Sequence, residues 1–292
     1  MLDVKPIKHI DYPTLTKALK QAVDAHIEKN KRDPSVSLYN DWLTCLRGVF
    51  EAAIKDQAIS RATNPAAEFK NKTRIKTEPD PLDADEMNKI IADIYKHNGD
   101  MWGAWFELGF YTGMRYPSEP SALTWQHVDF SRNEIKVNQI RNRHAKDGIQ
   151  KKTKTGVQRT ILLNSRAQHA IKKARAFSGF NDEWVFLQDV KNAAPVITGD
   201  PQRNMWRASL KRLGIRHRDM YNMRHSYATF GLMNNANPGF MASQLGHSLE
   251  EFFKTYAKWI NRMNNSQQLD FIEKGIQGNE VNEARLSHEK NS

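Results

Sequence analysis

The chain has 292 residues, enough for two globular domains, and 39% of them are hydrophobic and 26% charged. No apolar run of the sequence approaches the ~20 residues of a membrane span. Its single cysteine, Cys45, excludes an internal disulfide framework and a multi-cysteine metal site, and the opening residues lack the apolar core of a signal peptide. The formal net charge of +11 favours a polyanionic partner, with nucleic acid the first candidate and a solvated basic surface the plain alternative.

Residues 1–75 are expected to form a small all-helical unit. Apolar residues recur at helical spacing over residues 14–29 and again over roughly 38–58. The second run is expected to bury the face formed by Leu38, Trp42, Cys45, Leu46, Val49, Phe50 and Ile54. The pattern breaks at Pro65, and the charged stretch KNKTRIKTEPDPLD has little to bury, so a linker is predicted at 76–82.

Residues 83–275 are expected to form a larger, mainly helical unit with a small antiparallel sheet. Asp83, followed by Glu86 three residues later, is a capping box that begins the first helix. A second helix is expected to end near Gly113, and Ser165 is expected to cap another. The predicted later helices cover residues 101–111, 165–177, 200–213, 219–235 and 238–245.

Two strands of this unit are predicted from alternating apolar residues, over 134–140 and 158–163. The polar stretch KKTKTG between them reads as a turn. The final residues, 276–292, are polar and are expected to be a disordered tail.

Five polar sites of the larger unit could carry chemistry. They are Arg115 in YTGMRYPSEPSALTW, Lys154 in TKTG, Tyr221 with Arg224 in RDMYNMRHSYATF, His247 in QLGHS and Tyr256 in EEFFKTYAKW. Each also has a plain structural reading, as a surface cation, a helix-terminal histidine or a core tyrosine. Arg224 lies in an apolar helix, where a buried arginine needs either an internal carboxylate or a ligand phosphate.

In their order and in the residues that flank them, the five sites resemble the signature of the tyrosine recombinase (phage integrase) family. That signature is an arginine after Thr-Gly-x in a "TGxR…E…L.W.D(I/V)D" block, a lysine in a β-turn, an "(H/Y)xxRH" helix, then "LGH" and a tyrosine nine residues later. The resemblance covers about residues 80–262. Its matching residues are Arg115, Glu119, Leu123, Trp125, Asp129, Lys154, Tyr221, Arg224, His225, His247 and Tyr256.

The resemblance implies a catalytic domain of mainly α structure, preceded by a small all-α core-binding (SAM-like) domain. The implied activity is site-specific DNA recombination, in which duplex DNA is cleaved and rejoined through a 3′-phosphotyrosine to integrate or excise a phage or other mobile element. Arg115 and Arg224 would bind the non-bridging oxygens and His247 would donate to them. Tyr256 would be the nucleophile, Lys154 would protonate the 5′-oxygen, and Tyr221 would contact the phosphate. No metal or other cofactor is implied.

The chain departs from the family pattern at three positions. One extra residue separates Arg115 from Glu119, which would turn the glutamate by about 100° if both lay on one helix. We therefore expect either a strained register or a helix that starts after Arg115, with Ser118 as N-cap. Tyr221 stands where many members have histidine, and His127 replaces an aspartate in what reads as a structural position.

The smaller unit resembles the last helices of a core-binding domain, and only about ten residues precede the first of them. We expect the chain to begin inside that domain. Lysine and arginine near the linker and before the helix of Tyr221 and Arg224 could contact DNA: Lys70, Lys72, Arg74, Lys76, Arg216 and Arg218. In the family, C-terminal segments pack on a neighbouring protomer, although residues 257–277 could instead fold back on their own domain.

The partners implied are double-stranded DNA, further copies of the chain in a homo-tetramer, and accessory DNA-bending proteins, with no membrane. The location implied is the bacterial cytoplasm, at the nucleoid. Two alternatives remain: a Xer-type dimer resolvase, and a catalytically lapsed protein that occupies DNA sites without cutting. The DNA target sequence and the preferred direction of the reaction are not encoded in any motif of the chain.

Overall fold

The structure is a computed structural model. It describes residues 6–73, 78–142, 145, 148–151, 158–179, 181, 183–189, 191, 194–196, 199–260, 269–270, 272–274 and 276. The chain divides into two compact units, Met1–Glu78 and Pro79–Ser292. Within the described ranges, no helix is both long and apolar enough to cross a membrane. The assignment of 76–82 as a linker and of 276–292 as a tail stays a prediction.

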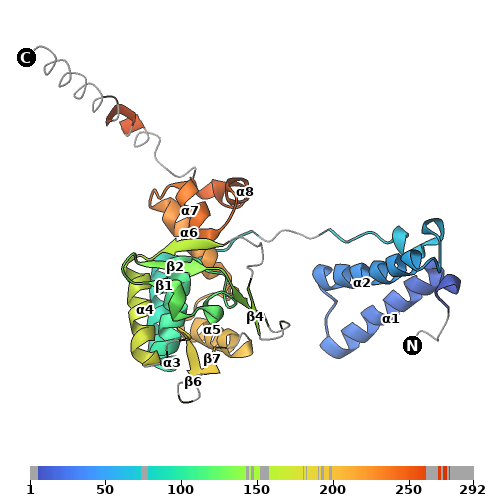
Figure 1. The fold of residues 1–292 in the computed structure, drawn as a ribbon, viewed down its shortest axis with the longest axis horizontal. Coiled ribbons are helices and arrows are strands. Elements are labelled where there is room, and N and C mark those ends of the chain that lie inside the picture. Colours follow the sequence, from blue (N-terminus) through green and yellow to red (C-terminus); the bar gives the residue numbers. More distant parts are fainter. Residues whose placement is uncertain are drawn as a thin grey trace, which may run out of the picture. The chain divides into compact units, whose positions relative to one another are not determined.

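The first unit consists of helices and short 3-10 turns (Figure 1). Its elements are η1 (Ile7–His9), α1 (Tyr12–Asn30), α2 (Val36–Lys55), η2 (Arg61–Thr63) and η3 (Pro65–Glu68). Asp11 caps α1 and Ser35 caps α2, each by accepting from a backbone N–H of the first turn. Both helices pack on η3. The two predicted helices are therefore confirmed.

The buried face of α2 differs from the predicted one. Leu43 and Phe50 are buried with at most 2% exposed, whereas Val49 is 58% exposed and Cys45 is exposed. The core of this unit is formed by Leu15, Leu43, Phe50, Ala66 and Phe69. A unit this small buries only a narrow stripe of each helix, so the wide apolar face predicted for α2 was wrong.

The larger unit begins with α3 (Ala84–Thr112). The predicted capping box is confirmed, because Asp83 accepts from the Glu86 N–H and the Glu86 side chain accepts from the Asp83 N–H. Two helices were predicted here, and they join into one element with a kink. At the kink Gly99 adopts φ 85° and ψ 174°, which is outside helical geometry.

The strands of the larger unit are short and antiparallel. They are β1 (Val128–Asp129), β2 (Glu134–Val137), β3 (Ile140–Arg141), β4 (Ile149–Gln150), β5 (Arg159–Leu162), β6 (Leu187–Asp189) and β7 (Ala194–Pro195). The three-stranded sheet has the order β1-β2-β5, with Ile135 opposite Ile161; β3 pairs with β4 and β6 with β7. The predicted small antiparallel sheet is confirmed, and the 134–140 stretch is split into β2 and β3.

Five further helices follow in this unit: α4 (Ser165–Ser178), α5 (Asp200–Leu213), α6 (Asn222–Met233), α7 (Pro238–Leu245) and α8 (Leu249–Ile260). The expected cap of α4 was wrong by one residue. Asn164 is the cap, since its Oδ1 accepts from the Ala167 N–H at 3.0 Å, and Ser165 is the first helical residue. Short 3-10 turns η4 (Pro120–Ala122) and η5 (Trp125–His127) link α3 to β1.

Two hydrophobic clusters stabilise the larger unit. The first joins α3, α4, α5 and the sheet around the fully buried Trp105 and Phe106. The second joins α6, α7 and α8, which group at one end of this unit in Figure 1. It consists of Ala228, Leu232, Met241, Ala242, Leu245, Phe252, Tyr256 and Trp259. This cluster fixes the ends of the three helices that carry most of the predicted site.

Candidate active site

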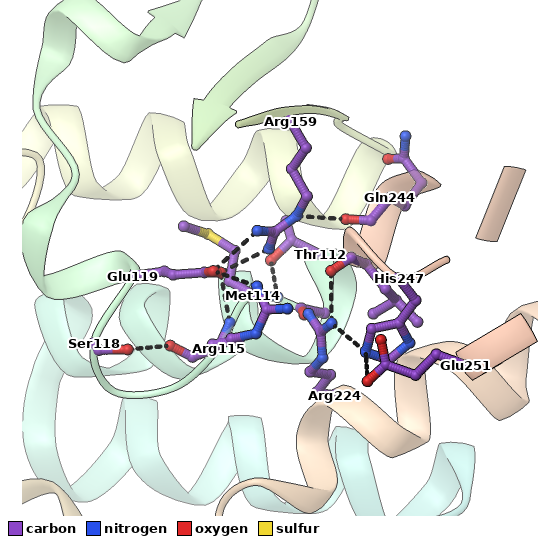
Figure 2. A network of polar contacts seen from close by, with 12 residues as sticks. Thr112, Met114, Arg115, Ser118, Glu119, Arg159, Arg224, Gln244, His247 and Glu251 are labelled. Atoms are coloured by element: carbon purple, nitrogen blue, oxygen red, sulfur yellow. Dashed lines mark hydrogen bonds and ion pairs between the residues drawn. The ribbon is translucent and has the colours of Figure 1, made fainter. Parts of the chain in front are cut away.

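The site lies where four segments of the larger unit meet. The loop after α3 carries Arg115, α6 carries Arg224, the turn between α7 and α8 carries His247, and α8 carries Tyr256. Figure 2 shows the side chains of Arg115, Arg224 and His247 directed into one region. The fold thus brings together residues that are far apart in the sequence; Arg115 and Arg224, for example, are separated by 109 positions.

Arg115 is placed by the end of α3 and by Glu119. Gly113 ends α3 with φ +61°, and a Cβ atom there would come within 2.6 Å of the side chains of Leu245 and Tyr227. Only glycine therefore permits both the turn and the close approach of α6 and α7. Glu119 accepts from the Arg115 backbone N–H at 2.7 Å and from Arg115 Nη1 at 3.0 Å.

The extra residue between Arg115 and Glu119 is accommodated by the loop. No helix contains both residues: the 3-10 turn η4 starts at Pro120 with Glu119, not Ser118, at its N-cap position. The expectation of a helix that starts after Arg115 is thus correct, while Ser118 as its cap was wrong. His127 is buried, and its Nδ1 lies 2.8 Å from Thr124 Oγ1, which fits the structural role predicted for it.

Arg159 is a further member of the site that sequence reasoning missed. It lies on β5, is 8% exposed, and donates through both Nη atoms to Glu119 and through Nε to the Gln244 carbonyl at 2.8 Å (Figure 2). It therefore ties the Arg115 loop to the end of α7. The signal was present in the sequence, because Arg159 occupies an inward position of the strand and a buried arginine requires partners.

Arg224 is 1% exposed and bridges two chain segments. Its Nη1 donates to the Gly113 carbonyl and its Nη2 to the Leu245 carbonyl, both at 2.6 Å, and Nη2 also lies 2.9 Å from His247 Nε2. Its Nε is buried with no hydrogen-bond partner in the part of the chain that the structure describes. No carboxylate of the described residues forms an ion pair with Arg224.

The site carries an excess of positive charge. Burial, and then the charge of Arg115, lower the pKa of Arg224 to about 10. Burial alone would raise the pKa of Glu119, but hydrogen bonds and charge from Arg159, followed by those from Arg115, outweigh it and lower the pKa to about 2. Three guanidiniums, of Arg115, Arg159 and Arg224, thus surround the buried carboxylate of Glu119. A second carboxylate, of Glu251, is 59% exposed and lies 4.0 Å from His247 Nε2 (Figure 2).

His247 follows α7 directly. Gly246 ends that helix with φ +68°, and a Cβ there would lie 2.9 Å from Arg159 Cδ, so glycine lets the turn close over the arginine. Burial, and then the charges of Arg224 and Arg115, lower the pKa of His247 to about 3. Since Arg224 donates to Nε2, the ring proton is on Nδ1, which is buried without a partner among the described residues.

Tyr256 is fully buried, and its hydroxyl is also held in the site. The ring packs on Phe252, with centroids 4.9 Å apart, and on Trp259 at 6.0 Å. Its Oη lies 2.8 Å from Nδ1 of His225 on α6. The two readings of this tyrosine are therefore compatible, because the core positions a hydroxyl that points at the helix of Arg224.

The remaining predicted residues lie in different surroundings. Tyr221 precedes α6, is 43% exposed and packs edge-on against His225 with ring centroids 5.1 Å apart. Lys70 and Lys72 are exposed on the first unit, where the Lys72 ammonium lies 4.0 Å from the Tyr39 ring centre. Three predicted residues, Lys154, Arg74 and Lys76, lie outside the described residues.

Arg216 and Arg218 are engaged in ion pairs. Arg216 donates through both Nη atoms to Asp80, at 2.5 and 2.8 Å, and Arg218 donates to Asp80 at 3.2 Å and to Glu86 at 2.9 Å. Arg218 is only 10% exposed. This network holds the start of the larger unit against the loop before α6. It occupies the Arg218 side chain, so we expect Arg218 to have a structural role in place of the predicted DNA contact.

This fold is that of the tyrosine recombinases, as the comparison with solved structures shows. The integrase of transposon Tn1549, in complex with circular intermediate DNA, is 18% identical with a TM-score of 0.64 over 92% of this chain and 87% of that chain. A lambda integrase dimer bound to a COC′ core site is 19% identical with a TM-score of 0.62, covering 86% of this chain and 66% of that chain.

The Phage integrase family model matches residues 81–261, and the chain belongs to this family. Prophage integrase IntR of Escherichia coli (strain K12) is 27% identical over 291 residues, which cover 90% of this chain. IntQ of the same organism, named as a supposedly defective protein, is 31% identical over 253 residues, or 78% of this chain. The chain spans 61% of the length of IntQ and 68% of that of IntR.

Proposed function

We propose that the chain is a site-specific DNA recombinase, which cleaves and rejoins duplex DNA through a 3′-phosphotyrosine intermediate. It would act as the integrase of a phage or other mobile element, in the bacterial cytoplasm. Membership of the phage integrase family supports this activity. The reaction needs neither ATP nor a metal ion in this scheme, since the phosphotyrosine bond conserves the energy of the broken linkage.

The observation that carries the proposal is the unpaired charge of Arg224. A buried guanidinium without a carboxylate partner is costly, and the excess of positive charge around it is that of a site built to receive an anion. A phosphodiester is a singly charged anion with two non-bridging oxygens, which matches two guanidinium groups. The hydroxyl of Tyr256, on the neighbouring helix α8, is directed at α6 beside Arg224, which supports its role as the nucleophile.

Each residue then has a role in the transfer. Arg115 and Arg224 bind the non-bridging oxygens and stabilise the charge that develops on them. The buried Nδ1–H of His247 supplies a further donor, and the exposed Tyr221 hydroxyl supplies a phosphate contact. Tyr256 attacks phosphorus, and Lys154 protonates the departing 5′-oxygen. Glu119 and Arg159 hold Arg115 in place.

Double-stranded DNA is the proposed substrate, and the active assembly is a tetramer of the chain on two DNA duplexes. Solved relatives support both features, because lambda integrase has been crystallised as a dimer on a core site and as a tetramer on a Holliday junction. Lys70 and Lys72, with Arg74 and Lys76, are the proposed backbone contacts of the first unit. Accessory DNA-bending proteins complete the assembly.

A nicked suicide substrate tests the activity. Cleavage next to the nick releases a short strand, so rejoining fails and the covalent protein–DNA adduct accumulates. We expect a denaturant-resistant adduct with the native chain and none with Tyr256→Phe, which should still bind the DNA in a gel-shift assay. Binding without any adduct would favour the alternative of a DNA-binding protein that has lost catalysis. The relative IntQ, which is named as a defective protein, is the reason to test that alternative. An adduct with Tyr256→Phe would refute the nucleophile.

A Xer-type dimer resolvase shares this chemistry and differs in its DNA. The two are separated by the site that the protein recombines: paired, identical sites on one circular molecule for a resolvase, and non-identical attachment sites for an integrase.

A further inference from the structure

The proposed reaction leaves the proton of Tyr256 without an acceptor. A phenol with an ordinary pKa near 10 is almost fully protonated at neutral pH, so the proton has to leave as the oxygen attacks phosphorus. Burial raises the pKa of Tyr256 further, and the charge of Arg224 opposes this shift without cancelling it. A base in contact with Oη is therefore required.

His225 is in contact with that hydroxyl. Its Nδ1 lies 2.8 Å from Tyr256 Oη, within the range for an O–H···N hydrogen bond, and the ring centroids are 5.7 Å apart. His225 directly follows Arg224 on α6, so the base and the phosphate-binding guanidinium belong to the same turn. Tyr221 packs edge-on against the imidazole and helps to fix its plane.

The imidazole is neutral and able to accept. Burial, and then the charge of Arg224, lower the pKa of His225 to about 4, so the ring carries one N–H and one lone pair at neutral pH. With the lone pair on Nδ1, the phenol proton has a partner inside its buried surroundings. A phosphodiester bound at Arg224 offsets the positive charge that lowers this pKa, which makes the imidazole a stronger base when the substrate is present.

We propose that His225 is a catalytic residue, which accepts the proton of Tyr256 during strand cleavage and returns it during strand rejoining. The inference rests on the proposed function and extends it to a residue that the sequence pattern alone does not assign to proton transfer. The proposal also accounts for Tyr221, which stands where many members of the family have histidine. If His225 is the base, Tyr221 does not have to be one.

Cleavage forms one bond, breaks one bond and moves two protons. The Oη–phosphorus bond forms, the bond from phosphorus to the 5′-oxygen breaks, the phenolic proton moves to Nδ1, and Lys154 protonates the 5′-oxygen. In rejoining, the 5′-hydroxyl attacks the phosphotyrosine, Lys154 takes its proton, and the imidazolium protonates the departing phenolate. No oxidant, metal or nucleotide enters the balance.

Two substitutions of His225 separate proton transfer from positioning. His225→Ala removes both the base and the hydrogen bond. His225→Asn keeps an amide oxygen close to the place of Nδ1, so it can hold the phenol but cannot take its proton. Single-turnover adduct formation on the nicked substrate is the readout, with melting temperature and DNA binding measured for each variant. His97→Ala, which changes a half-exposed histidine on α3, is the matched control.

A second substrate separates the base from the acid. A 5′-bridging sulfur at the cleavage site leaves as a thiolate, which needs no proton, so this substrate should rescue Lys154→Ala but not His225→Ala. We expect both His225 variants to form adduct about 10²–10⁴-fold more slowly on either substrate, as for loss of a general base. Added imidazole should partly restore His225→Ala.

The other results would overturn the proposal. A rate for His225→Asn close to that of the native chain would show that His225 only positions the phenol. Faster adduct formation by His225→Ala would show that it holds the tyrosine away from DNA. Rescue of His225→Ala by the sulfur substrate would place it on the leaving group. Should the native chain bind the substrate yet form no adduct, the proposed function itself fails and this inference falls with it.

Discussion

Arg159 donates to both carboxylate oxygens of Glu119, through Nη1 to Oε1 at 2.9 Å and through Nη2 to Oε2 at 2.6 Å. The same carboxylate accepts from the backbone and the side chain of Arg115. The position of Arg115 therefore depends on a residue of the sheet, 44 positions further along the chain, and not on its own loop alone.

Loss of this pair should destabilise the larger unit. Arg159→Ala leaves the Glu119 carboxylate buried without its bidentate partner, and breaking a buried ion pair in this way costs about 3–5 kcal/mol of unfolding free energy. Urea unfolding followed by tryptophan fluorescence measures the effect. Arg203→Ala is the control, because its pair with Asp200 is exposed and worth about 0–1 kcal/mol. Equal effects of the two substitutions would contradict a buried role for Arg159.

The two arginines that are proposed to bind the phosphate, Arg115 and Arg224, should not tolerate lysine. Arg115→Lys and Arg224→Lys keep the charge but lose the planar fork, and Arg224→Lys also loses the bridge between the Gly113 and Leu245 carbonyls. We expect adduct formation to fall about 10²–10³-fold in each variant. Single-turnover assays at saturating protein measure the rate. Rates within threefold of the native one, with binding unchanged, would argue against a direct phosphate contact.

Stability of the DNA-free chain should rise between pH 5 and pH 7. The folded-state pKa values of His225 and His247, about 4 and about 3, lie below the ordinary value of 6.5, so the unfolded chain binds more protons in this window. Protonation then favours unfolding as the pH falls below 6.5. The depressed pKa of Glu119, about 2, adds a loss only below its ordinary 4.5. Melting temperatures across this range test the prediction.

The double variant His225→Asn/His247→Asn supplies the comparison for that series. It removes these two histidines and leaves His127, whose pKa is also lowered by burial, so its melting temperature should change less between pH 5 and pH 7 than that of the native chain. A pH profile as steep as the native one would mean that other groups cause the dependence.

Salt dependence of DNA binding should distinguish phosphate contacts from structural arginines. Each exposed cation that contacts a phosphate adds about 0.9 to the slope of log K against log salt, so Lys70→Ala and Lys72→Ala should each lower the slope by about that amount. Arg218→Ala should leave the slope unchanged and lower the melting temperature, because this side chain is occupied by Asp80 and Glu86. Fluorescence anisotropy at several salt concentrations gives the slopes.

Local patterns in the sequence were sufficient for most helices. The capping box at Asp83 and the apolar periodicity after it depend on residues within one or two turns, and the structure has both. The cap of α4 was misplaced because Asn164 and Ser165 are adjacent and both are good caps. The two-residue strands β3 and β4 are too short to show alternation, so only their pairing across a turn defines them.

The roles of two site residues depend on contacts across the fold: Arg159 was missed in the sequence, and His225 was matched to the family pattern without a role of its own. Arg159 is part of the site because it donates hydrogen bonds to Glu119 and to the Gln244 carbonyl. His225 is part of it because it contacts the hydroxyl of Tyr256, which lies 31 positions away on another helix. Neither partner is visible in a linear pattern. Phe253 shows the converse: it is adjacent to the buried Phe252 in the sequence, yet it is 43% exposed, since α8 turns only one face to the core.

The complete burial of Tyr256 has a consequence for selectivity. A hydroxyl with no exposed surface is out of reach of free nucleotides, of loose DNA ends and of small electrophiles, so encounter alone produces no reaction. In the proposed reaction, the hydroxyl meets a phosphodiester only after α8 or the side chain shifts, and the free energy of that shift has to come from DNA contacts made elsewhere. Under this proposal, strand breakage is limited to duplexes that bind tightly enough to expose the Tyr256 hydroxyl. Selection among DNA sequences then depends on the binding free energy needed for that exposure and not on the reacting groups themselves.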